Sequence, residues 1–448
     1  MVRIFVLLVV MYSGVYTVGA QIIQPIDSTY LYAFPAFVKN VNRIKEKVWP
    51  GMTLGPACIF RLHGPAFLTG HPQPPAGAKL VGDSIYMFPQ ADYGIMGTSQ
   101  TEINKHLTAH NNYGQTHYVS LNQFYAELFH ELHHVYQRTH IKQLKFDNPA
   151  DLLTYPEDYH NDAIHQYENE LLLEMLSASP KQLAEYINKF YSCRMLRKDI
   201  IGDKYADYEK NVESSEGPST YCEYMYMKEF ASTAKEREYI NKRFYFTLVE
   251  PAYGREGLRN RFLLSGMVQC ILLSKTFKNW QTEYYTSGLT LNDFFFLKFK
   301  PHNVKLPALT DYETKAKYFT ALEKEKHKNH LDAFHSQNGI KISITFKDIP
   351  QLKGLDPMHA ESVSDSLVLH STLLKLAKGN NYLTVANKSV ATYVHGQIWK
   401  VKKVTLFVPE NSIQIDQDIF ICNEENATIR WKYISQVKTG NEYIVMLE

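Results

Sequence analysis

The chain has 448 residues, of which 45% are hydrophobic and 13% aromatic, enough to bury more than one core. Its 48 basic and 46 acidic side chains leave a formal net charge of +2, with no long block of one sign. This balance excludes the strongly basic surface that is typical of nucleic-acid-binding proteins, so we expect no nucleic-acid partner.

The first twenty residues have the pattern of a signal peptide. Arg3 precedes the apolar run 4–11, and the small residues at 18–20 supply a cleavage site. We therefore expect residues 1–20 to be removed, the mature chain to begin near Gln21, and its location to be secreted or periplasmic. The apolar run is too short for a membrane anchor, and no later segment has the length of a membrane span.

Three regions follow, and they differ in the period of their apolar residues. Residues 21–115 are rich in turn formers that separate short apolar runs, so we expect loops and a few strands. Over 116–335, apolar residues recur three and four positions apart, which predicts helices. Over 336–448 the period becomes two, which predicts a β domain. The expected fold class is α+β, with a mostly helical region followed by a sandwich-like C-terminal β domain.

The stretch His130-Glu131-Leu132-His133-His134 contains the pattern H-E-x-x-H. On a helix, residues four apart lie on one face, so His130 and His134 can reach one tetrahedral zinc ion while Glu131 stands beside the open coordination position. An apolar stripe on the other side of this helix predicts that the two histidines face a cleft. His133 lacks the four-residue spacing, so we expect it to flank the site.

A zinc ion held by two histidines needs a third protein ligand. Glu168 is one candidate, because it lies within the apolar face of a predicted helix over 161–178, where a carboxylate needs a partner. That partner could be zinc, a ligand histidine, or an arginine such as Arg194 or Arg197. The residues around Glu168 leave this choice open.

A second candidate is Glu216, which forms the pattern E-G-x-x-x-Y with Gly217 and Tyr221. Together with the earlier H-E-x-x-H, this pattern resembles the zinc-binding elements of the gluzincins, a group of zincin metallopeptidases that includes the aminopeptidase N-like enzymes. The resemblance implies that His130, His134 and Glu216 bind zinc, and that the glutamate beside the first histidine is the general base.

The resemblance is confined to these two short elements and their order. Pro218 stands where the family usually has an apolar residue, and the separation between the elements is several-fold longer than in the aminopeptidases. Because proline is tolerated in the first turn of a helix, we expect Ser215 to cap a helix whose first turn is 216–218. More loosely, GHPQPPAG, TEINKHLTAH and YPED resemble segments of uncharacterised exported bacterial proteins that carry H-E-x-x-H.

These features predict an exported zinc-dependent peptidase that acts on a peptide or protein substrate, with a zincin-like catalytic region at 21–335 and a β domain at 336–448. The alternative is a non-catalytic exported binding protein with a degenerate zincin body and a ligand-binding β domain. An intact Glu131 argues against that alternative, since zinc binding alone does not need it. A structural zinc site is disfavoured, because such sites usually have four protein ligands rich in cysteine, and no cysteine lies near the motif.

Overall fold

A computed structural model of the chain describes residues 23–448 except 63, 94, 96, 115–117, 252, 256, 357–358, 365 and 396. The expected signal peptide lies outside the described residues. The chain divides into two compact units: unit 1 is Met1–His140 with Met225–Glu236, and unit 2 is Ile141–Tyr224 with Arg237–Glu448. Across the described residues, no helix combines the length and the apolar character needed to cross a membrane.

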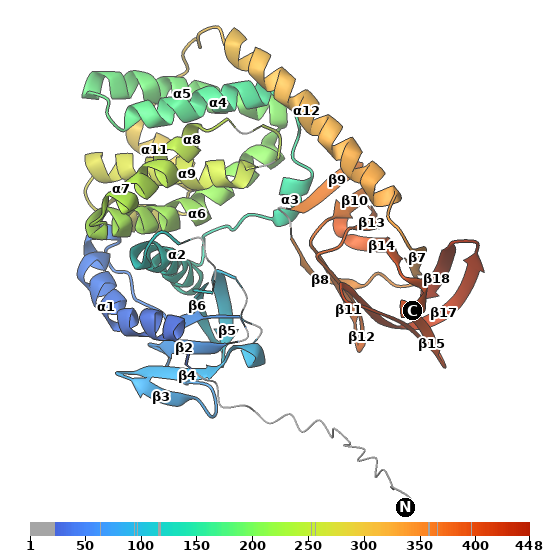
Figure 1. Cartoon of the computed structure of the whole chain (residues 1–448). Coiled ribbons are helices and arrows are strands. Elements are labelled where there is room, and N and C mark those ends of the chain that lie inside the picture. The colour runs from blue at the N-terminus through green and yellow to red at the C-terminus, as the bar shows by residue number, and fades with distance from the viewer. Residues whose placement is uncertain are drawn as a thin grey trace, which may run out of the picture. The chain divides into compact units, whose positions relative to one another are not determined.

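Unit 1 contains a six-stranded sheet with the strand order β3-β4-β2-β1-β6-β5. β1 pairs parallel with β6, and the other neighbours pair antiparallel. Helix α2 (Leu121–His140) contacts β6 (Figure 1), and Asn111 Nδ2 on that strand donates to Phe124 O of the helix at 2.9 Å. The strands are β1 (Ala57–Phe60), β2 (Pro65–Thr69), β3 (Lys79–Gly82), β4 (Ile85–Pro89), β5 (Ser99–Ile103) and β6 (His106–Asn112).

A 24-residue helix, α1 (Pro25–Val48), precedes the sheet, where the sequence predicted loops and strands. Pro25 occupies the first turn, where its missing N–H costs no hydrogen bond, whereas Pro35 lies inside the helix. Phe37 stacks on Tyr125 of α2 with ring centroids 4.7 Å apart. The prolines therefore predicted loops where the chain forms a helix. The buried aromatic side chains of α1 pack this helix against α2.

Helix α2 begins where its side chains bond the chain before it. Ser120 Oγ accepts from Gln123 N at 3.2 Å, and Gln123 Oε1 accepts from Val119 N at 2.7 Å, close to the reciprocal pattern of a capping box.

The sequence predicted that the histidine face of α2 lines a cleft. In the structure His130 and His134 are buried, with 8% and 5% of their surface exposed.

Unit 2 begins with a helical region and ends with a sheet. Helix α6 (Asp203–Phe230) runs through this region and contributes its residues from Met225 onward to unit 1. Helix α7 (Ala234–Ile240) likewise begins in unit 1 and passes into unit 2 at Arg237. The other helices of unit 2 are α3 (Pro149–Leu153), α4 (Tyr159–Met175), α5 (Pro180–Ile201), the π-helix η2 (Asn241–Phe246), α8 (Thr247–Val249), α9 (Leu258–Thr276), α10 (Trp280–Ser287), α11 (Leu291–Phe299) and α12 (Thr310–His335).

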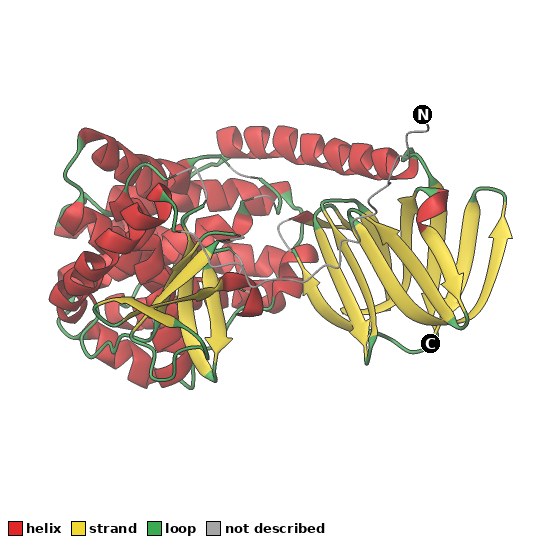
Figure 2. Cartoon of the chain, turned by 60° about the horizontal axis from the view of Figure 1, so that its bottom comes forward, coloured by secondary structure: helices red, strands yellow, loops and turns green. Residues whose placement is uncertain are grey.

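The C-terminal region is one strongly curved, barrel-like sheet (Figure 2), in which ten strands follow the order β8-β11-β12-β17-β18-β7-β14-β13-β10-β9. β18 pairs parallel with β7, while β15 and β16 extend from β17. The strands are β7 (Ile340–Phe346), β8 (Gln351–Leu355), β9 (Ala360–Ser364), β10 (Leu367–His370), β11 (Leu373–Lys378), β12 (Asn381–Ala386), β13 (Val390–His395), β14 (Gln397–Val408), β15 (Ile413–Asp416), β16 (Ile419–Glu424), β17 (Ala427–Thr439) and β18 (Glu442–Leu447).

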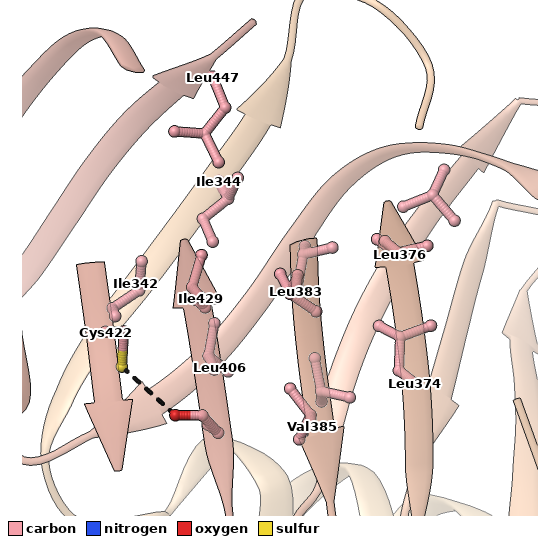
Figure 3. Close-up of a cluster of buried hydrophobic side chains, with 14 of the residues drawn as sticks. Ile342, Ile344, Leu374, Leu376, Leu383, Val385, Leu406, Cys422, Ile429 and Leu447 are labelled. Atoms are coloured by element: carbon pink, nitrogen blue, oxygen red, sulfur yellow. Dashed lines mark hydrogen bonds between the residues drawn. The ribbon is translucent and has the colours of Figure 1, made fainter. Parts of the chain in front are cut away.

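The expected sandwich is therefore wrong, although the α+β class and the C-terminal β region are confirmed. The physical reason lies in β17, whose first half pairs with β12 and β16 and whose second half pairs with β18. One long strand thus joins what would be two sheets in a sandwich. Inward-pointing side chains such as Ile342, Leu383 and Ile429 share a single core (Figure 3).

Candidate metal centre

Three of the side chains that the sequence singled out lie together. Within the part of the chain that the structure describes, one group of histidine, cysteine or acidic side chains could hold a metal ion: His130, His134 and Glu216. Each offers one ligand atom, and these atoms lie within 4.8 Å of one another. Two imidazoles and a carboxylate form a donor set that suits a divalent transition metal. The structure therefore contains a candidate metal centre with three protein ligands.

The two histidines come from successive turns of α2. Their Nε2 atoms are 3.0 Å apart, near the roughly 3.3 Å expected for two nitrogens on one tetrahedral ion. His134 Nδ1 lies 2.9 Å from Gln137 Oε1. Because an amide oxygen can only accept, His134 Nδ1 carries the proton and Nε2 keeps the lone pair that a metal needs. Gln137 was not predicted as part of the site, although its spacing of three residues from His134 on a helix was a usable signal.

Glu131 is held from the sheet of unit 1. Gln100 on the edge strand β5 donates through Nε2 to Glu131 Oε2, and Arg138 Nε donates to Gln100 Oε1 at 3.2 Å. The bond from Arg138 fixes the orientation of the Gln100 amide, so that its NH₂ group faces the carboxylate. Gln100 had no signal in the sequence, because it lies 31 residues from Glu131.

Glu216 lies in the middle of α6, so the expectation that it starts a helix capped by Ser215 is wrong. Pro218 sits inside this helix, where it removes one backbone hydrogen bond. Gly217 makes a close approach to α9: a Cβ atom built on it would lie 2.6 Å from Gly266 Cα. The glycine after Glu216 is therefore required by the packing of α6 against α9.

Arg259 pairs directly with the candidate ligand. Its Nη2 donates to Glu216 Oε1 at 2.8 Å and to Asp147 Oδ1 at 3.2 Å. Burial acts to lower the pKa of Arg259, but the two carboxylates outweigh it, so the pKa is raised and the guanidinium stays charged. Arg259 was not predicted as part of the site, since nothing in the local sequence links it to Glu216, 43 positions earlier.

Glu168 lies elsewhere, in a buried ionic cluster of unit 2. Its two oxygens lie 2.7 Å from Arg194 Nη2 and 3.1 Å from Arg197 Nη1. Arg194 also pairs with Glu213, and Arg197 with Glu209, both on α6. Glu168 has the arginine partners that the sequence offered as one of its alternatives, and it is not among the three grouped side chains.

Other residues near the motifs have structural roles. His133 is fully buried, and its ring packs against Trp49 at 4.6 Å. Burial lowers the pKa of His133 well below its usual value, so it is a neutral core residue. Tyr221 OH bonds Ser274 Oγ at 2.9 Å, and all five cysteines are free and buried. Neither His133 nor Tyr221 belongs to the grouped ligands.

We compared the chain with protein-family models, with curated proteins and with solved structures, and none of them matches.

Proposed function

We propose that the chain is a zinc-dependent peptidase of the zincin type, as its resemblance to the gluzincins implies. The observation that carries the proposal is the group His130, His134 and Glu216, with Glu131 next to the first ligand on the same helix. Three protein ligands leave a tetrahedral ion one position for water, which is the arrangement of catalytic rather than structural zinc sites. The choice of a peptide bond as the substrate rests on the resemblance.

The residues of the chain divide the work in this proposal. His130, His134 and Glu216 would hold the zinc ion, which would supply a water molecule of lowered pKa and polarisation of the substrate carbonyl. The carboxylate of Glu131 takes the proton from the attacking water and returns it to the leaving amine. Gln100 restrains that carboxylate through its hydrogen bond, and Gln137 keeps His134 in the tautomer whose Nε2 can bind the metal. Acid and base steps thus rely on one restrained carboxylate.

The first prediction concerns the base. Glu131→Gln should keep zinc binding and the fold, because Glu131 is not a ligand, but should lower peptide turnover by about two decades or more. The assay is a digest of a peptide library by the purified chain, followed by kinetics on the best substrate. Glu102→Gln, the same change at an exposed carboxylate of β5, is the control.

Full turnover in Glu131→Gln would contradict the peptidase mechanism. If the wild-type chain binds zinc but cleaves no peptide, the alternative of a non-catalytic binding protein gains support.

A further inference from the structure

Arg259 joins two carboxylates that are largely withdrawn from solvent. The side chain of Asp147 is 7% exposed and that of Glu216 13% exposed, while Arg259 itself is 27% exposed. Both bonds come from the same nitrogen, Nη2, at 2.8 and 3.2 Å. Hydrogen bonds between charged groups at such distances are about twice as strong as those between neutral groups. The rotation of the Glu216 carboxylate is therefore restrained.

The position of Arg259 in the chain is unfavourable by itself. It lies in the first turn of α9, directly after Leu258, and a cation at a helix N-terminus opposes the helix dipole. Lysine and arginine are favoured at the other end of a helix. The two carboxylates offset this cost, so the arrangement needs all three charges together.

The same three residues connect three separate segments of unit 2. Asp147 lies seven residues after His140, the last residue of α2, while Glu216 is on α6 and Arg259 on α9. The bond to Asp147 fixes the guanidinium from one side, so that it meets Glu216 in one orientation. Glu216 is the ligand that comes from outside the histidine helix, and its placement depends on α6 and its neighbours.

We propose that Arg259, held by Asp147, is a positioning residue that sets the orientation of the metal ligand Glu216. The proposal rests on the metal centre described above. Without Arg259, the carboxylate must be ordered at the moment the metal binds, and this ordering weakens metal binding. Losing a partner that orients a ligand costs about 10- to 100-fold in metal affinity.

The competing explanation is that Arg259 only ties the three segments together. In that case its loss lowers the melting temperature but leaves the zinc affinity of the folded chain unchanged. The chain offers a matched control in Arg243, which pairs at 3.7 Å with Glu223, another carboxylate of α6. Arg243 is 26% exposed, nearly the same as Arg259, and Glu223 is 4% exposed.

The experiment measures zinc affinity by competition with a chelator of known affinity, on full-length variants first shown folded by circular dichroism. The melting temperature of each variant is measured separately in excess chelator. Arg259→Met should weaken zinc binding by about 10- to 100-fold, and Arg259→Lys should recover part of that loss. Arg243→Met should change zinc affinity by less than about twofold, because its partner is not a ligand. With cobalt in place of zinc, the absorption spectrum of Arg259→Met should differ from that of the wild type, whereas the spectrum of Arg243→Met should not.

Unchanged zinc affinity in a folded Arg259→Met chain, with a lower melting temperature, would overturn the proposal and leave Arg259 a structural role. If Arg259→Met does not fold, Asp147→Asn replaces it. Asp147→Asn should weaken zinc binding, by less than the roughly 10- to 100-fold expected for the direct partner of a ligand; an unchanged affinity there also overturns the proposal. If Glu216→Ala binds zinc as tightly as the wild type, Glu216 is not a ligand. That result would contradict the proposed metal centre itself, and the role of Arg259 with it.

Discussion

At the scale of single residues, the bond between His134 and Gln137 decides which nitrogen of His134 can face a metal. The bond uses Nδ1 of His134, so the Nε2 atom of His134 faces the Nε2 atom of His130, 3.0 Å away. His133, between them in sequence, is turned into the core against Trp49. Three neighbouring histidines on one helix therefore have two different roles, and the difference follows from the 3.6-residue helical period.

A second prediction at this scale concerns Asp162, a buried carboxyl of unit 2. Burial raises the pKa of Asp162 from 3.8 to about 6, against the pull of Arg261 and a bond from Gly254 N. Because the pKa of Asp162 is higher in the folded chain than in the unfolded chain, folding favours the protonated carboxyl. The stability that this provides is fully present below about pH 4 and is lost as the pH rises through about 6. The full loss amounts to about 3 kcal/mol.

Asp162→Asn removes that titration and keeps an oxygen for the bond from Gly254 N. The wild type loses this stability as the pH rises and the variant does not. The unfolding free energy of the variant minus that of the wild type should therefore increase by up to about 3 kcal/mol between pH 4 and pH 7. The measurement is urea unfolding of both chains over this range, in chelator so that metal binding does not contribute. A difference between the two chains that does not vary with pH would contradict the raised pKa.

The residues that sequence reasoning could find are those whose spacing is local. His130, Glu131 and His134 share one helix, so a periodicity of four was sufficient to group them. Glu216 was found only through its resemblance to a family element. Gln100 and Arg259 act through contacts between segments far apart in the chain, and no local pattern marks such residues.

At the scale of elements, the packing of α6 against α9 leads to a third prediction. Gly217→Ala should lower the unfolding free energy by roughly 1 to 3 kcal/mol, because the added Cβ would lie 2.6 Å from the backbone of Gly266 and the helices must separate. The gain in helix propensity, about 1 kcal/mol, is too small to compensate. Since Arg259 lies on α9, zinc affinity should fall as well.

Urea unfolding and chelator competition on the same preparation measure both effects of Gly217→Ala. Wild-type stability together with wild-type zinc affinity would show that α6 and α9 do not need this close approach.

Helices α1 and α6 show why element boundaries were hard to predict. Proline is normally a sign that a helix ends, yet Pro35 and Pro218 both lie inside helices. In each case tertiary packing outweighs the cost of one lost hydrogen bond: α1 buries an aromatic face on α2, and α6 packs closely against α9 at Gly217, next to Pro218. The helix propensity of the local sequence does not include this stabilisation by tertiary packing.

At the scale of the whole molecule, the period-two pattern of the C-terminal region predicted strands correctly but could not distinguish two sheets from one. That distinction depends on the partners of β17, which pairs with different strands along its two halves. Alternation of apolar residues is the same in a sandwich and in a closed sheet, because both have one buried face. Pairing between distant strands is therefore the information that the sequence pattern lacks.

Export is a fourth prediction and concerns the chain as a whole. We propose that cleavage of the signal peptide leaves a mature chain that begins near Gln21, since the charged, apolar and small-residue segments follow in the order that a signal peptidase requires. N-terminal sequencing of the protein recovered outside the cytoplasm measures this directly. An intact Met1 on the exported protein would contradict cleavage.

The central claim, that His130, His134 and Glu216 hold a zinc ion, is tested most directly by the zinc affinity of three folded chains measured against one chelator. The wild type should bind one zinc per chain, and Glu216→Ala should bind it more than about 100-fold more weakly, because a ligand is lost. Glu168→Gln should bind zinc as the wild type does, since the partners of Glu168 are Arg194 and Arg197. Zinc binding that survives in Glu216→Ala and is lost in a folded Glu168→Gln chain would contradict the account.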